Sequence, residues 1–198
     1  MTGKIGILAY GSLICDPGDE IKPIIVRRID CRTPFKVEFA RTSSSRDGAP
    51  TLVPYDNGSQ VAAQLLVVDL PLSEATNRLY RRELHRVGEK LTYDATKKVT
   101  PNSVVIKTLR DFEGLDMVLY TSIDANIEGL TAAKLAALAI CSARARTDGH
   151  DGISYLINAK KAGIRTPLSG EYEAEIKRLT GVASLEEALA AWHSKPHH

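Results

Sequence analysis

A short loop near the start of the chain carries the first residues whose types suit chemistry. Tyr10-Gly11-Ser12-Leu13 follows the apolar run 4–9, so a buried strand delivers this loop to the end of a sheet. Gly11 permits backbone conformations that other residues avoid, and successive N–H groups in such a turn form an anion-binding concavity. Ser12 adds a hydroxyl that donates or accepts a hydrogen bond. The loop is therefore a candidate binding site for a small anionic group, and an ordinary strand-to-loop turn is the alternative.

Glu83 is the second candidate, because it is an acidic residue in the apolar stripe of a predicted helix. Leu79 precedes it by four residues and Val87 follows it by four, which places all three on one face. A carboxylate on such a face must be paired, hydrogen-bonded or protonated. A buried carboxylate also exchanges protons closer to neutrality than an exposed one. Glu83 is therefore a candidate acid–base residue, and an ion pair with Arg82, Arg86 or another arginine is the alternative.

Other acidic and histidine residues suit chemistry less well. Glu38 alternates outward on its predicted strand, Glu74 fits the favourable first turn of a helix, and Glu89 follows a glycine in a predicted loop. His150 lies among Asp and Gly residues, but the spacing matches no metal-ligand signature. We expect the His150 segment to be a loop that caps the next helix.

Strands are predicted mainly in the first two thirds of the chain. Alternating or continuous apolar patterns indicate strands at 4–9, 24–29, 35–41, 51–55, 60–70, 104–109 and 115–123. The turn Asp56-Asn57-Gly58-Ser59 predicts that strands 51–55 and 60–70 form a hairpin, because Asn-Gly is a strong turn signal. The segments 104–109 and 115–123 are predicted to form a second antiparallel pair.

Helices dominate elsewhere. One is predicted from a Ser73 cap to about Val87, with Gly88 as its stop. Further helices are predicted at 131–144, 151–162 and 169–179, and a last short one begins at a capping box of Ser184 and Glu187. Strands first and helices later, with one helix between strands, indicate an α+β fold rather than alternating βαβ units.

Composition limits the class of protein. The 198 residues suit one domain, with a net charge of +2 that is too small to predict a nucleic-acid or acidic-membrane partner. No stretch is apolar enough to predict a membrane span or a signal peptide. Cys15, Cys31 and Cys141 are odd in number and widely spaced, so neither a disulfide framework nor a zinc site is predicted. We expect a cytoplasmic protein with reduced thiols.

Several islands of the sequence resemble the γ-glutamylcyclotransferase-like family, which includes the glutathione-degrading ChaC-type enzymes. The segment 7–13 (ILAYGSL), followed by 16–18 (DPG), is similar to the opening strand and loop of that family. The segment 49–54 (APTLVP) resembles its central hairpin, and 79–83 (LYRRE) resembles a stretch that carries the catalytic Glu. The segment 163–172 is similar to a region near the family's C-terminus. Two positions depart from the family pattern, since Ala63 replaces a Gly and Tyr93 stands ten residues after Glu83 rather than about seven.

The resemblance implies a fold, a reaction and roles for residues. The implied fold is a γ-glutamylcyclotransferase-like mixed β-barrel or sheet with flanking helices, with residues 1–125 as a β-rich core and 126–198 as a helical C-terminal part of the same domain. The implied reaction converts a γ-glutamyl amide or peptide to 5-oxoproline and a free amine. Glu83 is then the catalytic proton shuttle, and Tyr10, Gly11, Ser12 and Leu13 bind the substrate. No metal or organic cofactor is implied, and the amine half of the substrate and the oligomeric state stay open.

Two other functions fit the same residues. One is a non-catalytic small-molecule binding module on the same fold, in which Glu83 has a structural role. The other is an acyl hydrolase or transferase with Ser12 as its nucleophile, although Ser12 lies in no G-x-S-x-G elbow and no histidine stands out as its base.

Overall fold

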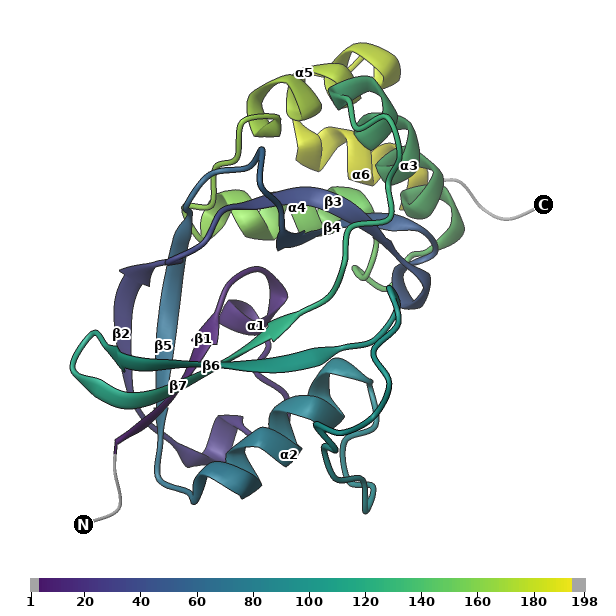
Figure 1. The fold of residues 1–198 in the computed structure, drawn as a ribbon. Helices are drawn as coiled ribbons and strands as arrows, with labels where there is room; N and C mark the ends of the chain where they lie inside the picture. Colours follow the sequence, from purple (N-terminus) through teal and green to yellow (C-terminus); the bar gives the residue numbers. More distant parts are fainter. Residues whose placement is uncertain (1–3, 194–198) are drawn as a thin grey trace. The chain divides into compact units, whose positions relative to one another are not determined.

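The chain forms an α+β structure with two compact units. The computed structural model describes residues 4–193. Unit 1 contains residues 4–34 and 62–124, and unit 2 contains residues 35–61 and 125–193 (Figure 1). The α+β class is therefore confirmed. Residues 35–61 group with the C-terminal helices rather than with the other strands of the first 125 residues. No helix of the described residues has the length and apolar character needed to cross a membrane.

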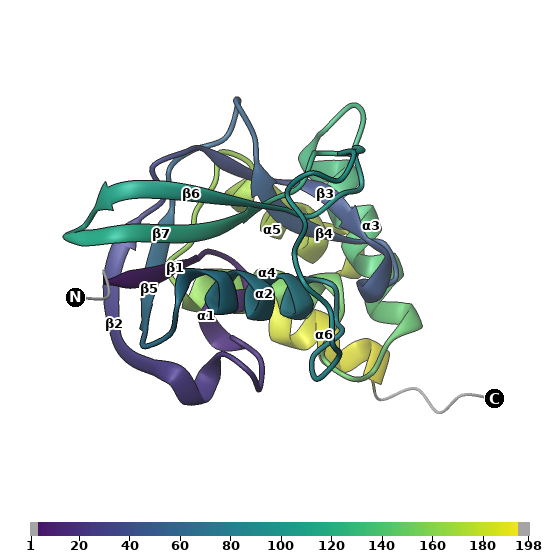
Figure 2. The same cartoon turned by 60° about the horizontal axis from the view of Figure 1, so that its bottom comes forward.

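A mixed five-stranded sheet forms the centre of unit 1. Its strands are β1 (Ile5–Ala9), β2 (Ile25–Arg32), β5 (Ala62–Val68), β6 (Val105–Phe112) and β7 (Leu115–Ser122), in the order β2-β5-β1-β7-β6. The β1–β7 pair is parallel, and the other pairs are antiparallel. The predicted antiparallel pair β6–β7 is confirmed, and Figure 2 shows it as a long hairpin. The sheet has open edges at β2 and β6, so these strands form the sheet rather than the barrel of the expected fold.

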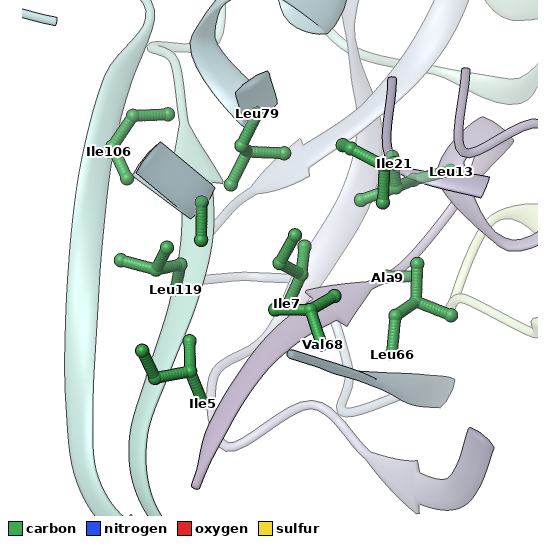
Figure 3. Packing of buried hydrophobic residues seen from close by; sticks show 11 residues of the cluster. Ile5, Ile7, Ala9, Leu13, Ile21, Leu66, Val68, Leu79, Ile106 and Leu119 are labelled. Carbon is green, nitrogen blue, oxygen red and sulfur yellow. The ribbon is translucent and has the colours of Figure 1, made fainter. Parts of the chain in front are cut away.

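The apolar core of unit 1 lies between one face of this sheet and the helix α2 (Leu72–Glu83) (Figure 3). The central strand β1 is buried along its whole length, which explains its continuous apolar sequence. The helical turn α1 (Ser12–Cys15) lies within the predicted loop 10–18, which is therefore partly helical, and the 3-10 turn η1 (Lys22–Ile24) follows that loop. The core residues are Ile5, Ile7, Ala9, Leu13, Ile21, Leu66, Val68, Ala75, Leu79, Ile106 and Leu119.

The helix α2 begins two residues earlier and ends about four residues earlier than predicted. Its N-cap is Pro71 rather than Ser73, and its last helical residue is Glu83. The helix ends where His85 adopts a left-handed conformation (φ 54°), with its N–H bonded to Arg82 O and the next N–H bonded to Arg81 O. This is a Schellman motif, in which glycine is the usual residue at the position of His85. The predicted end of the helix was wrong because Gly88, the next glycine along the chain, was taken as the stop signal.

Unit 2 combines a two-stranded ribbon with helices. The ribbon pairs β3 (Val37–Ser43) with β4 (Ala49–Pro54) through the 3-10 turn η2 (Ser44–Arg46). Figure 1 shows the helices gathered around this ribbon. These helices are α3 (Ala132–Ala145), α4 (Gly152–Lys161), α5 (Ser169–Thr180) and α6 (Leu185–His193).

Residues at the ends of these helices cap them, including Thr131, for which the sequence predicted no cap. The Thr131 hydroxyl accepts from Lys134 N, and one oxygen of Asp151 accepts from two amides at the start of α4. Gly181 ends α5 in a left-handed conformation. The Ser184 hydroxyl accepts from Glu187 N at 3.1 Å, and the Glu187 carboxylate accepts from Ala183 N at 3.1 Å. The predicted caps at 151 and 184 are therefore confirmed, although the return bond from Glu187 goes to Ala183, one residue before the Ser184 cap.

The predicted hairpin around Asn57-Gly58 is wrong. The turn forms, since Gly58 N donates to Tyr55 O at 3.0 Å, but the next residue bridges Val37 of β3. The strand β4 pairs with β3, whereas β5 pairs with β1 and β2. Gly58 is needed here because a Cβ at its position would lie 2.1 Å from Val37 O. A turn signal predicted the change of direction, but not which strand would be the partner.

The expectation that Glu38 faces outward is also wrong. The register of β3 against β4 shifts between Glu38 and Arg41, and residues 37–40 are all buried. Glu38 is 1% exposed, and its carboxylate accepts from Phe39 N at 2.8 Å and from Leu168 N at 3.2 Å. Simple alternation fails at such an irregularity, because the extra residue changes the face to which the side chains point.

Tyr172 carries a buried polar atom in unit 2. Its hydroxyl is fully buried, and no hydrogen-bond partner is found for it among the described residues. Burial raises the pKa of this hydroxyl, and the negative charge of Asp151 adds to the effect. We expect Tyr172→Phe to raise the free energy of unfolding by about 1 kcal/mol, because it removes an unpaired buried group. Urea unfolding of wild type and variant measures this difference.

Tyr155→Phe is the matched control. The Tyr155 hydroxyl accepts from Leu52 N at 3.3 Å, and its ring also lies in the core of unit 2. Loss of this hydroxyl leaves a buried N–H without that acceptor, so the control is expected to lower stability by about 1 kcal/mol. An equal loss in Tyr172→Phe would contradict the expectation.

Candidate functional site

The Tyr10–Leu13 loop is a tight turn at the end of β1. Gly11 has φ 82° and ψ −139°, a conformation that in practice only glycine adopts, and it precedes the helical turn α1. The Ser12 and Leu13 amides lie in the first turn of α1, where N–H groups have no intrahelical acceptor. The Leu13 side chain is buried in the core, so only its backbone can meet a ligand. The Tyr10 hydroxyl donates to Thr121 O at 2.5 Å, which holds the ring to β7.

Two arginines hold this turn from other elements. Arg28 of β2 donates from Nη1 to Ile14 O at 3.2 Å and to Gln64 Oε1 at 2.9 Å. Arg82 of α2 donates from Nη2 to Ser12 Oγ at 3.2 Å and to Asp16 O at 2.6 Å. The loop is therefore fixed by guanidinium groups as well as by its own backbone, and both groups add positive charge near it.

Glu83 is the last residue of α2, and its side chain is 21% exposed. Arg82 Nη1 donates to Glu83 Oε1 at 2.8 Å, so the alternative explanation of an ion pair with Arg82 is confirmed as a contact. No bond to Glu83 Oε2 is found in the part of the chain that the structure describes. Val87, which was expected to continue the stripe, lies beyond the helix and is 40% exposed.

The structure brings the two candidate motifs together. Ser12 and Glu83 both bond to the guanidinium of Arg82, one through Nη2 and the other through Nη1. Sequence reasoning considered Arg82 only as a neutralising charge and missed its role as a bridge. A signal was present, since Arg82 follows Ala75 by seven residues and Leu79 by three, which also places it on the inward stripe. Its own side chain is 11% exposed.

The other arginines of α2 are paired with acids. Arg78 bonds to Glu74 at 2.9 Å, and Glu74 lies in the first turn of α2 as predicted. Arg81 donates from Nη2 to Glu20 Oε2 at 2.5 Å and from Nη1 to Leu91 O at 3.0 Å. The second oxygen of Glu20 accepts from Gly88 N at 2.5 Å. Glu20 and Arg81 therefore tie the segment that follows Glu83 back to α2.

Tyr93 has a packing role. Its N–H donates to Asn77 Oδ1 at 2.8 Å, and its hydroxyl accepts from Ile106 N at 3.2 Å. Its ring meets that of Tyr80 edge to face, with centroids 5.1 Å apart. These contacts fix the loop after Glu83 against α2 and β6.

The remaining chemical residues lie elsewhere. His150 is in the turn before α4, where the next residue, Asp151, caps the helix as predicted. Cys15, Cys31 and Cys141 are free thiols, and burial raises the pKa of Cys31 to about 11, so this group is a poor nucleophile. Among residues 4–193, no group of three or more His, Cys, Asp or Glu side chains is arranged to hold a metal ion.

Comparison of the chain with protein-family models, with curated proteins and with solved structures finds no match. The likeness to γ-glutamylcyclotransferase-like proteins therefore depends on the motifs of the sequence, and the assignment stays a prediction.

The Glu20–Arg81 pair gives a test of how the segment after Glu83 is held. The Arg81 hydrogen bond lowers the pKa of Glu20 below its ordinary value of 4.5. A carboxyl whose pKa is lower in the folded state stabilises the fold above its unfolded pKa, and this stabilisation is lost as the pH falls. We expect Glu20→Gln to lower the free energy of unfolding by about 1–2 kcal/mol at pH 7. The difference in the free energy of unfolding between wild type and Glu20→Gln, called the gap below, should shrink as the pH falls below 4.5 and passes through the lower pKa of Glu20 in the folded state.

Urea unfolding between pH 7 and pH 3 measures this gap at each pH (roughly the range over which carboxyl groups titrate). Glu89→Gln is the control, because its pair with Arg86 is about half exposed and should contribute little. A gap that stays constant with pH would contradict the role of the Glu20 carboxylate.

Proposed function

We propose that the protein is a γ-glutamylcyclotransferase-like enzyme that cyclises a small γ-glutamyl amide or peptide to 5-oxoproline and releases the amine. The observation that carries the proposal is the shared guanidinium, since Arg82 bonds to both Ser12 of the loop and Glu83 of α2. This contact places a candidate anion-binding turn and a candidate base at one locality in unit 1.

The chemistry needs little beyond positioning and proton transfer. The α-amine of the glutamyl group attacks its own side-chain carbonyl, so a new C–N bond forms and closes the five-membered ring. The original amide C–N bond then breaks, and the amine leaves. Because the attack is intramolecular, the enzyme has to hold the substrate in a folded conformation. Glu83 takes one proton from the α-ammonium group before the attack and gives it to the nitrogen of the leaving amine. It then takes a second proton from the ring nitrogen and passes it to the released amine, which leaves as its ammonium ion, so charges and atoms balance.

The position of Glu83 supports this role. A carboxylate at the last residue of a helix lies next to the negative end of the helix dipole, which is an unfavourable place for an acid. Such departures from local preference are expected at functional sites, where another interaction offsets them. Here the bond from Arg82 to Glu83 Oε1 supplies that interaction, and Glu83 Oε2 stays available for a substrate proton.

The position of the loop supports substrate binding. The Ser12 and Leu13 amides at the start of α1 provide donors, and the guanidinium groups of Arg28 and Arg82, which themselves bond to protein atoms, add positive charge around the loop. Both features suit the α-carboxylate of a glutamyl group or the oxyanion that develops during attack. The ring of Tyr10, held to β7 through its hydroxyl, forms one wall in this proposal.

The two alternatives make different demands on the same residues. In the binding module, Glu83 is present only to pair with Arg82, and the observed contact is also consistent with this role. In the acyl hydrolase, Ser12 needs a base, yet its hydroxyl accepts from a guanidinium, which cannot take its proton. The second alternative is tested by intact mass spectrometry with a p-nitrophenyl ester, since an adduct that Ser12→Ala removes would establish it.

The proposed function is tested with a panel of γ-glutamyl dipeptides, γ-glutamyl-amines and glutathione, with 5-oxoproline measured by mass spectrometry. We expect release from at least one member. Glu83→Gln should lower the rate by about 100- to 10,000-fold, because the amide cannot shuttle protons. The fold should persist, since glutamine is close to glutamate in size and its side-chain oxygen can still accept from Arg82.

Glu89→Gln makes the same chemical change six residues further along, in an exposed pair with Arg86. It should leave the rate unchanged. Unchanged turnover in Glu83→Gln would overturn the role of Glu83. No release from any member would contradict the proposed reaction and favour the binding module, which titration of the same compounds by calorimetry would then test.

A further inference from the structure

Arg82 is a nearly buried cation with several partners. Its side chain is 11% exposed, and a buried charge is costly unless it is paired and hydrogen-bonded. Glu83 Oε1 lies at 2.8 Å from Nη1, and Ser12 Oγ and Asp16 O lie at 3.2 and 2.6 Å from Nη2. The carboxylate of Asp16 is more distant, at 3.9 Å, and is 71% exposed. The guanidinium is therefore paired mainly by Glu83 and by the loop.

The planar shape of this group gives the contacts a defined geometry. Nη1 and Nη2 are fixed relative to each other, so the guanidinium sets the positions of Glu83 and Ser12 together. Ser12 and Glu83 belong to different elements, α1 and α2, and no direct hydrogen bond between them is found among the described residues. An error of about 1 Å in such positions is enough to lower turnover about 100-fold.

We propose that Arg82 is a positioning residue, which orients the Glu83 carboxylate and the Ser12 loop toward one bound substrate. This inference rests on the proposed function. Arg82 acts through Glu83 and Ser12 rather than on the reacting atoms, so its loss should reduce kcat more than it changes KM. Lysine should not replace it, because a single ammonium group cannot present two fixed donors to both partners.

The kinetic test uses Arg82→Lys, which keeps the charge, and the best substrate of the panel. We expect kcat to fall about 100-fold, as for a misplaced base, with KM changed by less than about threefold. Arg86→Lys is the matched control, since Arg86 lies four residues on and pairs only with the exposed Glu89 in the described chain. It should leave both constants within about twofold of wild type.

A second test needs no turnover. Ser12→Ala, Glu83→Ala and the double variant, each of which removes the acceptor of its Arg82 bond, are unfolded in urea, first with Arg82 present and then in an Arg82→Met background. If both residues bond to one guanidinium, their effects on stability are not additive with Arg82 present and become additive without it. If Arg82→Met does not fold, Arg82→Lys serves as the second background, in which the coupling should be weaker.

The possible outcomes separate the bridge between Ser12 and Glu83, the positioning role of Arg82 and the proposed function. Additive effects with Arg82 present would overturn the bridge, whatever the activity. A wild-type rate in Arg82→Lys, when Glu83→Gln is inactive, would overturn positioning by Arg82 and leave the proposed function intact. Absence of turnover by the wild-type protein over the whole panel would overturn the proposed function, and with it the role of Arg82 in that reaction. The urea unfolding cycle would still decide whether Arg82 couples Ser12 to Glu83. Coupling with Arg82 and a loss confined to kcat would support the inference.

Discussion

The hydrogen bonds of the partly buried Arg82 guanidinium are the interactions on which the arrangement of the candidate site depends. This charge is largely removed from water, so it needs an anion and several acceptors close by. Glu83 supplies the anion, and the loop after β1 supplies a hydroxyl and a carbonyl. The same contacts that satisfy Arg82 therefore join the end of α2 to the start of α1. Function and stability draw on one set of bonds here, which makes a lysine at this position a poor substitute.

Charges elsewhere in unit 1 follow the same logic. The helix α2 carries Arg78, Arg81 and Arg82, and Arg86 lies just beyond its end. Each of these four arginines has an acid nearby. The more buried pair, Glu20 and Arg81, restrains the segment that follows Glu83. The exposed pair of Arg86 and Glu89 carries no such restraint. Burial rather than the count of ion pairs separates contacts that order the site from contacts that do not.

Unit 2 satisfies its buried acids in another way. Glu38 and Asp151 are almost fully buried, and the bonds found for them come from backbone N–H groups and, for Asp151, also from the Ser154 hydroxyl. A carboxylate can be held by oriented amides without a cation, because each N–H contributes part of the positive charge. Tyr172 is the contrasting case, in which a buried hydroxyl has a raised pKa and no partner among the described residues. Polar burial in this unit therefore depends on backbone geometry more than on pairs of side chains.

The sequence by itself determined the elements that depend on neighbours along the chain. The strand β1, the β6–β7 pair and the caps at Thr131, Asp151 and Gly181 follow from apolar patterns and local hydrogen bonds. Only the tertiary structure decided the partner of β4 and the burial of Glu38, because strand partners and register shifts depend on contacts between distant parts of the chain. The end of α2 is local but carries His85 where a Schellman motif usually has glycine, so the glycine signal did not mark it. It also decided that Arg82 joins Ser12 to Glu83. Periodicity placed Glu83 on the inward stripe, but no local pattern states which loop a buried guanidinium will meet.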